Sequence, residues 1–341
     1  MKYNILGNTG LKVSELCLGT MTFGGGEGMW KAIGELQQNE VNELIKTAVN
    51  GGINFIDTAN IYSEGVSEEM TGKAIKDLGL NRHELVIATK VRGKMGEGPN
   101  QSGLTRKHIL QQAEESLKRL NVDYIDLYQI HGFDALTPLE ETLSALDILV
   151  QHGHVRYIGC SNLAAWQIMK ALSISEREKF KKFISLQAYY TIAGRDLERE
   201  IVPLLKDQKL GLMVWSPLAG GLLSGKYGRD IKSGEGRRKN FDFPPVNEGK
   251  AFDIIDILKP MAEAKGASVA QLSLAWLLHQ KTVTTVIVGA KKTSQLADNL
   301  KAVDVKFTED ELKKLDVVSK LSPEYPGWML ERQGGDRKAE D

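Results

Sequence analysis

The stretch INFIDTANIYSEG, residues 53–65, begins as an apolar run and then turns polar, with Asp57 at the point of change and Tyr62 five residues later. The apolar part is typical of a buried β-strand. An ionised carboxylate beside such a strand is costly unless it has a partner. Asp57 is therefore either an ordinary turn or cap residue or a partnered residue of a functional site, and the ends of the other strands distinguish the two.

Eight short runs rich in apolar and β-branched residues recur along the chain. They cover residues 15–20, 53–59, 85–91, 124–131, 155–162, 183–190, 210–217 and 285–290. The segments between them have the apolar period of helices, and capping-box patterns at Thr137-Pro138 with Glu140 and at Ser268 with Gln271 mark two helix starts. Strands that are apolar almost throughout and alternate with helices indicate parallel pairing with right-handed crossovers.

This alternation predicts a closed (β/α)8 TIM barrel that forms a single domain over residues 1–341. A doubly wound sheet and a two-domain chain are the alternatives. No GxGxxG pattern follows the first strand, so the usual sign of a dinucleotide-binding doubly wound sheet is missing. The glycine-rich residues 24–28 lack that spacing, and no helix start is expected directly after them. We interpret them as a flexible loop over the barrel mouth, with a phosphate cradle as the alternative.

Three segments lie outside the repeat. Residues 1–13 are expected to form a β-hairpin around Asn8-Thr9-Gly10 that plugs the N-terminal end of the barrel. Residues 218–267 are too long for an ordinary connection, so we expect a functional loop with an extra helix at about 249–264. Residues 303–341 should contain a helix that opens at Thr308, followed by a tail whose last dozen residues are mobile.

Composition narrows the function classes. Lys plus Arg and Asp plus Glu both number 44, which argues against nucleic-acid and membrane partners. Cys17 and Cys160 lie in apolar contexts, as buried thiols do, and no metal site is expected. The N-terminus lacks the apolar core of a signal peptide, and no stretch reaches the roughly 18–20 apolar residues that span a bilayer. We therefore expect a cytoplasmic protein.

Almost every predicted strand ends in a residue that can bind a ligand. These residues are Gly19, Thr20, Asp57, Lys90, His131, Ser161, Asn162, Gln187, Ser216 and Gly289. Because the active sites of barrel enzymes lie at the C-terminal ends of the strands, this pattern predicts one site. Taken singly, Lys90 could be a solvated lysine, His131 a strand cap and Tyr62 a packed loop residue. Together with Asp57 at neighbouring strand ends, they indicate a catalytic group.

The charges suggest what this group does. Asp57 and Lys90 can form an ion pair, which offsets the cost of burying either one. A phenol has a reference pKa of about 10. The Lys90 cation and a hydrogen bond from His131 would lower the pKa of Tyr62, which suits a general acid in a reduction and a general base in an oxidation.

At these residues the sequence resembles the aldo-keto reductase family. The matching stretches include LCLGTMTFG (16–24), GGINFIDTANIYSEGVSEE (51–69), SLKRLNVDYIDLYQIH (116–131), WSPLAGGLLSGKY (215–227) and IVGAKKTSQLADN (287–299). The resemblance is to the branch with aryl-alcohol dehydrogenase-like proteins and relatives of potassium-channel β subunits. It implies NADPH-dependent reduction of aldehydes and ketones, with Tyr62 as proton donor, His131 orienting the carbonyl, and Asp57 and Lys90 tuning the phenol.

The resemblance also implies a cofactor site across the barrel mouth. Its residues would be Gly19, Thr20, Met21, Asp57, Ser161, Asn162, Gln187, Trp215, Ser216, Pro217, Leu218, Gly220, Gly225, Lys226, Arg238, Gly289, Ala290, Lys291, Gln295 and Asn299. Trp215 would stack on the nicotinamide ring. Many family members have Arg where Gln295 stands, to bind the 2'-phosphate of NADPH. We favour NADP, with Lys291, Lys292 or Arg238 for this phosphate, and NAD is the alternative.

The substrate is the least specified part. Phe23, Trp30, Phe133 and Trp328, with Met21, are expected around the mouth, where they would favour an aromatic or otherwise apolar aldehyde. Ordinary loop packing is the alternative. A regulatory or redox-sensing NADP-binding subunit similar to the channel β subunits is the rival function, and a barrel isomerase or lyase is a third. The oligomeric state stays open.

Overall fold

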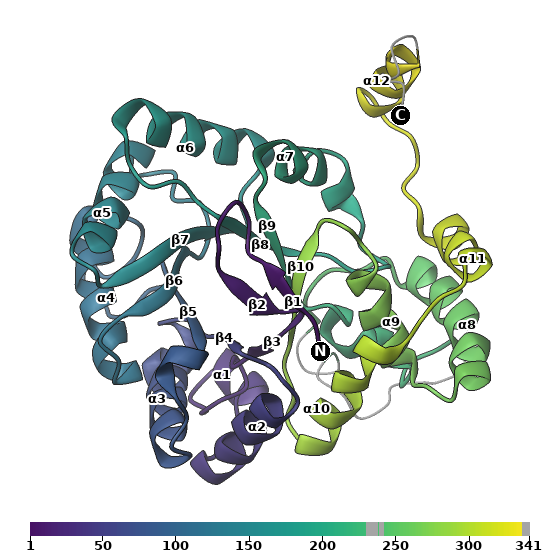
Figure 1. The fold of residues 1–341 in the computed structure, drawn as a ribbon, viewed down its shortest axis with the longest axis horizontal. Helices are drawn as coiled ribbons and strands as arrows, with labels where there is room; N and C mark the ends of the chain where they lie inside the picture. The colour runs from purple at the N-terminus through teal and green to yellow at the C-terminus, as the bar shows by residue number, and fades with distance from the viewer. Residues whose placement is uncertain (230–237, 239–241, 336–341) are drawn as a thin grey trace.

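The computed structural model describes residues 1–229, 238 and 242–335. Eight parallel strands close into a barrel in the order β10-β3-β4-β5-β6-β7-β8-β9 (Figure 1). The strands are β3 (Leu16–Gly19), β4 (Phe55–Asp57), β5 (Val86–Val91), β6 (Ile125–Ile130), β7 (Val155–Ser161), β8 (Ser185–Tyr189), β9 (Gly211–Trp215) and β10 (Val283–Val288). Seven lie within predicted runs, and β10 overlaps the run 285–290 but begins two residues earlier, so the predicted (β/α)8 barrel is confirmed.

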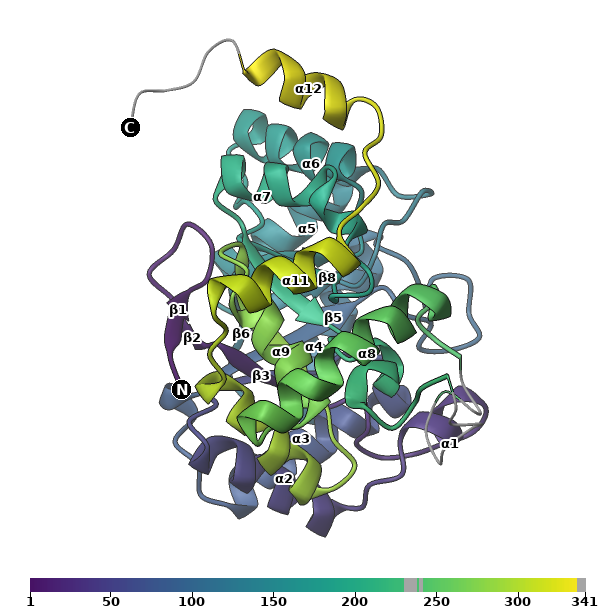
Figure 2. The same ribbon diagram turned by 90° about the vertical axis from the view of Figure 1, so that its right-hand side faces the viewer.

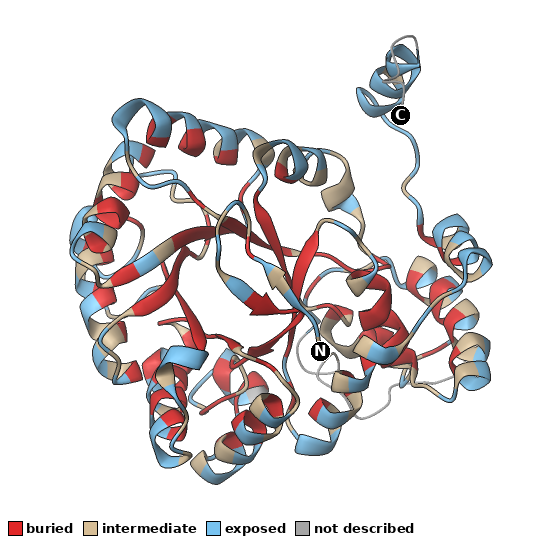
Figure 3. Cartoon of the chain, in the orientation of Figure 1, coloured by how far each residue is buried: buried red, intermediate tan, exposed pale blue. Residues whose placement is uncertain are grey.

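Helices surround the barrel and connect its strands. They are α2 (Gln38–Asn50), α3 (Val66–Asp77), α4 (Arg106–Leu120), α5 (Leu139–Gln151), α6 (Ala165–Glu178), α7 (Ile201–Gln208), α9 (Val269–Leu278) and α10 (Thr293–Leu300). Figure 3 shows their buried residues on the side that faces the strands and their exposed residues on the outside. The strands are buried on both faces, which explains why they are apolar almost throughout.

The predicted helix starts are largely confirmed. Ser268 and Gln271 form a capping box at the start of α9. The expected start at Thr137 is wrong by one position, because Pro138 is the N-cap of α5. The Thr137 hydroxyl instead donates to Asp134 Oδ2 at 2.8 Å, and no side chain caps this helix.

The N-terminal hairpin plugs the barrel as expected. Strands β1 (Tyr3–Ile5) and β2 (Lys12–Ser14) pair antiparallel and lie across one end of the barrel (Figure 1). Leu6 and Val13 have no exposed surface and pack in one cluster with Leu127 and Met213 of the barrel interior. The plug therefore completes the core at the N-terminal end and leaves the C-terminal end as the mouth.

The long connection after β9 contains the 3-10 helix η4 (Ala219–Ser224) and the helix α8 (Glu248–Lys265), close to the predicted helix at 249–264. Helix α11 (Glu309–Ser319) opens with the expected capping box at Thr308. A further helix, α12 (Gly327–Gly334), was not predicted, and Figures 1 and 2 show that it extends away from the barrel. Part of the tail predicted to be mobile, residues 336–341, lies outside the described residues.

Two further findings concern the mouth and the surface. A short helix, α1 (Met29–Ile33), directly follows the glycine-rich residues 24–28. The expectation that no helix starts there is wrong, because Trp30 and Ile33 are buried and anchor this turn to the body. Within the described part of the chain, none of the helices is long and apolar enough to cross a membrane.

Candidate active site

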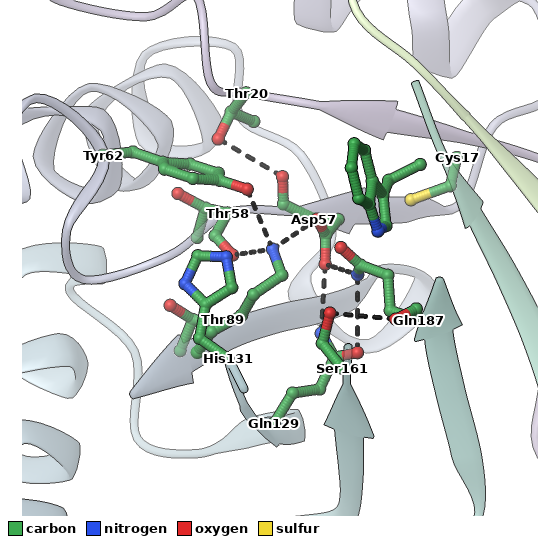
Figure 4. Close-up of polar contacts among 12 residues, drawn as sticks. Cys17, Thr20, Asp57, Thr58, Tyr62, Thr89, Gln129, His131, Ser161 and Gln187 are labelled. Carbon is green, nitrogen blue, oxygen red and sulfur yellow. Dashed lines mark hydrogen bonds and ion pairs between the residues drawn. The ribbon is translucent and has the colours of Figure 1, made fainter. Parts of the chain in front are cut away.

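Three neighbouring strands bring Asp57, Lys90 and His131 to the barrel mouth, and the 3-10 helix η1 (Tyr62–Gly65) adds Tyr62 (Figure 4). The Lys90 ammonium donates to Asp57 Oδ2 at 2.6 Å, to the carbonyl oxygen of Thr58 at 2.7 Å and to the Tyr62 hydroxyl at 3.3 Å. The predicted ion pair is therefore confirmed. Its lysine also contacts the phenol, as the sequence suggested.

The surroundings keep Lys90 charged. Burial alone would lower the pKa of this ammonium, but the Asp57 carboxylate and the Tyr62 phenol together raise it above its usual value. The lysine side chain has no exposed surface and that of Asp57 only 3%. A cation held in this way stabilises negative charge on the Tyr62 oxygen.

His131 is neutral at physiological pH. Burial lowers the pKa of its imidazole to about 3, and the positive charges of Lys90 and Arg92 contribute. Its ring meets the Tyr62 ring edge to face, with 5.8 Å between the centroids. A neutral imidazole keeps one N–H group, so His131 can donate a hydrogen bond beside the phenol without carrying a charge.

Sequence reasoning missed Gln129. The amide nitrogens of Gln129 and Gln187 both donate to Asp57 Oδ1, at 3.1 and 2.9 Å (Figure 4). Gln129 is fully buried and lies opposite Gly159 in the strand register, where a Cβ would come within 3.3 Å of Gln129 Cγ. A signal was present, because side chains alternate along a strand and Gln129 therefore points to the same side as His131.

The backbone after Tyr62 is unusual. Ser63 and Glu64 have φ angles of 47° and 56°, which side chains other than glycine and asparagine seldom adopt. The buried Ser63 hydroxyl donates to the carbonyl oxygen of Phe23 at 2.9 Å and so ties this turn to the loop after β3. Two such residues directly after Tyr62 mean that the surrounding packing, and not local preference, sets the position of the phenol.

The residues expected to hold the nicotinamide form one hydrogen-bonded group. The Ser161 hydroxyl donates to the carbonyl oxygen of Gln187 at 2.9 Å, and Asn162 Nδ2 donates to the carbonyl oxygen of His131 at 3.2 Å. The Trp215 indole donates to Asn162 Oδ1 at 3.0 Å. One face of this indole is stacked parallel to the ring of Phe243, with 5.8 Å between the centroids. The Tyr189 ring also contacts this indole, with 5.2 Å between the centroids.

The connection after β9 has a tightly packed backbone with several positive φ angles. Gly220 and Gly225 have φ angles of 66° and 84°. A Cβ on Gly220 would lie 2.6 Å from the carbonyl oxygen of Phe243, and one on Gly225 would lie 3.0 Å from Val269 Cβ. Ser216 and Ala219 also have positive φ angles. Side chains at Gly220 and Gly225 would therefore collide with neighbouring parts of the protein, and the N–H of Gly220 already donates to Ser216 Oγ at 3.1 Å.

The other cofactor candidates are spread along the same rim. Gly19 and Gly289 end the adjacent strands β3 and β10. Lys291 is paired with Glu35 at 3.2 Å, and its backbone N–H donates to Gln295 Oε1 at 3.0 Å, while Lys292 is exposed. The remaining candidates of the mouth and of the connections after β9 and β10 are Thr20, Met21, Pro217, Leu218, Lys226, Ala290 and Asn299.

Arg238 has a different position from the one expected of a phosphate ligand. Its guanidinium donates to the carbonyl oxygens of Ala219 and Pro244 and pairs with Asp242, and only 6% of the side chain is exposed. In this structure Arg238 therefore holds the connection after β9 together.

Only some of the residues expected to line the substrate site lie at the mouth of the barrel. The Trp30 and Tyr62 rings contact edge to face, and Met21 packs with them. Phe23 is fully buried in the main core, because it packs beneath the mouth loops. Trp328 lies on α12, away from the barrel, and contacts Tyr325.

The positions of the acidic, histidine and cysteine side chains bear on metal binding and thiol chemistry. No group of three or more His, Cys, Asp or Glu side chains that could hold a metal is found in residues 1–229, 238 and 242–335. Cys17 and Cys160 are both buried, as expected from their apolar contexts. Burial raises the pKa of both thiols, so they stay protonated.

Comparisons with known proteins agree with this geometry. The model of the "Aldo/keto reductase family" matches residues 15–320. A probable voltage-gated potassium channel subunit beta from Oryza sativa subsp. japonica is 37% identical over 331 residues, which cover 95% of this chain and 98% of that protein. A putative aryl-alcohol dehydrogenase from Schizosaccharomyces pombe is 37% identical over 339 residues, covering 92% and 94%.

A reductase is also among the relatives. The versiconal hemiacetal acetate reductase of Aspergillus parasiticus is 37% identical over 339 residues, covering 93% of this chain and 96% of that protein. The family match covers nearly the whole barrel, and the relatives include the branch that the sequence motifs resemble. The chain therefore belongs to the aldo/keto reductase family, as an oxidoreductase of carbonyl compounds that uses a nicotinamide cofactor.

Proposed function

We propose that this protein reduces aldehydes and ketones to alcohols with NADPH, and that Tyr62 is the proton donor. The observation that carries the proposal is the position of the Lys90 ammonium, which donates both to Asp57 and to the Tyr62 hydroxyl. Lysine in this arrangement stabilises the phenolate that remains after proton transfer. The arrangement therefore supports acid catalysis at one defined oxygen.

Each of the residues His131, Tyr62 and Lys90 has its own role in the proposed reaction. Reduced nicotinamide supplies a hydride to the carbonyl carbon when it is bound. His131, as a neutral donor, orients the carbonyl oxygen toward Tyr62. The Tyr62 hydroxyl gives its proton to that oxygen, so the C=O double bond becomes a C–H and an O–H bond. Lys90 stabilises the resulting phenolate until the proton is replaced from solvent.

The cofactor contacts are part of the proposal. Ser161, Asn162 and Gln187 would hold the nicotinamide amide. Gln187 presents its amide nitrogen to Asp57, which leaves its oxygen for an N–H donor. Trp215 would stack on the ring. The glycine backbone at 220 and 225 would contact the pyrophosphate.

NADP is favoured over NAD because of the lysines near the start of α10. Lys292 is exposed, so its ammonium is open to a 2'-phosphate, whereas Lys291 would have to exchange its pairing with Glu35 for one. A binding titration with NADPH and NADH tests this preference. A Lys292→Ala variant should lose affinity for NADPH and keep its affinity for NADH, and equal affinities in the wild type would contradict the assignment.

Aromatic or apolar aldehydes are the proposed substrates, since Met21 and Trp30 pack beside Tyr62 at the mouth. A regulatory, NADP-binding role is the alternative, because three relatives that this chain matches over nearly their whole length are named as channel subunits. The location in the cytoplasm stays a prediction.

One experiment separates the reductase from the alternative. NADPH absorbance is followed with 4-nitrobenzaldehyde as substrate, in the wild type and in Tyr62→Phe. Steady oxidation of NADPH by the wild type and its loss in the variant support the reductase. Tight NADPH binding without turnover of any aldehyde in a panel would favour the regulatory role.

A further inference from the structure

Arg92 lies two residues after Lys90, at the edge of the mouth, and the proposed reaction does not use it. Its φ angle is 147°, in a region that L side chains rarely adopt. Its carbonyl oxygen accepts a hydrogen bond from the N–H of Gly103 at 3.0 Å, which helps to hold this backbone. A strained residue beside an active site motivates a functional hypothesis, because the strain persists only where the surroundings impose it.

The side chain is held next to His131. Arg92 Nε donates to the carbonyl oxygen of Phe133 at 2.9 Å. The chain passes over Gly132, where an added Cβ would lie 3.5 Å from Arg92 Cδ and 3.6 Å from Nε. The positive charge also acts on His131, whose pKa it helps to lower. The guanidinium is therefore fixed beside the residue proposed to orient the carbonyl.

Arg92 forms no ion pair with a carboxylate among the described residues, although its charge helps to lower the pKa of Asp134. Within the same part of the chain, its two terminal NH2 groups make no hydrogen bond. Asp134 is nearby, but its oxygens already accept from the N–H groups of Leu104 and Leu136 and from the hydroxyl of Thr137. By contrast, the charge of Lys90 is balanced by Asp57.

An exposed guanidinium with one nitrogen fixed and two NH2 groups available is suited to bind a carboxylate through two parallel hydrogen bonds. We infer that Arg92 is a specificity residue that binds a carboxylate carried by the substrate, so that the preferred substrates are aldehydes or ketones with an acidic group. This inference rests on the proposed reductase function and narrows its substrate class.

The test compares acids with their neutral esters. The ortho, meta and para formylbenzoates and their methyl esters are reduced with NADPH by the wild type and by Arg92→Gln, which removes the charge and keeps an N–H donor for the Phe133 carbonyl. At least one acid should be preferred over its ester by the wild type. The preference is measured as kcat/KM for the acid divided by kcat/KM for its ester. In Arg92→Gln this ratio should fall by about tenfold or more, mainly because KM for the acid rises.

Two further variants sharpen the test. Lys94 lies two residues on and pairs with Glu97, so Lys94→Gln makes the same charge change away from Phe133 and should leave the ratio unchanged. Arg92→Lys keeps the charge without the planar fork and should retain part of the preference.

Four results would overturn the inference. Values of kcat/KM in Arg92→Gln that match the wild type for acids and for esters alike would mean that Arg92 does not contact the substrate. An equal loss for acids and esters would mean that Arg92 only supports the loop after His131. If the wild type reduced the esters without preferring any acid, the reductase function would stand and the carboxylate site would not. Failure to reduce either set would refute both.

Discussion

Lys90 Nζ and Asp57 Oδ2 lie 2.6 Å apart in a place from which water is excluded. Burying both charges is costly, and the pair contributes little to stability compared with apolar residues of the same size. Removing one partner is different, because it leaves an unpaired charge. We expect the pair to be retained for the chemistry at Tyr62 and not for the stability of the barrel.

Asp57→Asn tests this explanation. The variant leaves Lys90 without its counter-ion, so the free energy of unfolding should fall by about 3–5 kcal/mol and activity should be lost. The double variant Asp57→Leu with Lys90→Met should recover much of the stability and remain inactive. Urea unfolding with turnover assays checks both. A double variant as unstable as Asp57→Asn would show that the ion pair is structural.

Tyr62→Phe removes only the hydroxyl that contacts Lys90. The turnover number should fall by about 10²–10⁴-fold, because the carbonyl oxygen loses its general acid. The dissociation constant for NADPH should stay within a few-fold of the wild type, since the phenol is not among the proposed cofactor contacts. Stopped-flow kinetics measures the change in turnover, and a binding titration measures the dissociation constant for NADPH. Wild-type turnover by this variant would refute the assignment of Tyr62.

Gln129→Leu removes one of the two amide donors from Asp57 Oδ1 and keeps a side chain of similar size. The carboxylate then has more unshielded negative charge, which disfavours phenolate at Tyr62. The upper limb of the pH profile of kcat/KM should therefore move to higher pH. Gly159→Ala, which crowds Gln129 and Ser185 Oγ, should shift it in the same direction. If the pH profile of kcat/KM were unchanged in both variants, Gln129 would have only a packing role.

The order of the elements could be predicted from sequence because each strand is buried on both faces and is therefore apolar, as in the run 85–91 that became β5. The ion pair of Asp57 and Lys90 could also be predicted, since both end neighbouring strands. Gln129 was missed because the predicted run 124–131 ends at His131, although Gln129 lies in register with Lys90 on the neighbouring strand.

Other features depend on packing that sequence patterns do not report. Trp30 is drawn into a short helix by its contact with Tyr62, and a run of glycines gives no sign of it. The αL backbone of Ser63 is imposed by its bond to Phe23, forty residues earlier in the chain. The strained backbone of Arg92 likewise follows from contacts with residues more than ten positions away.

His131 gives a prediction about pH. Its pKa in the folded protein, about 3, lies below its ordinary value of 6.5. The stabilising contribution of the neutral ring is therefore complete above about pH 6.5 and is lost as the pH falls toward 3. Between pH 7 and pH 5 the wild type should lose roughly 1 kcal/mol more unfolding free energy than His131→Asn, allowing for partial exposure of the ring. Equal losses would show that the imidazole is charged in the folded state.

Trp215 allows cofactor binding to be observed directly. Its indole has a stacked aromatic neighbour and is bonded to Asn162, so a nicotinamide ring placed on it should quench its fluorescence. Trp215→Phe should keep most of the affinity for NADPH and lose most of the quenching, and Trp215→Ala should weaken binding by roughly tenfold. Trp166 is an exposed residue on α6, so Trp166→Phe is the matched control. This variant should keep both the affinity for NADPH and the quenching. Because only Trp215 is proposed to touch the ring, full quenching in Trp215→Phe would place the nicotinamide elsewhere.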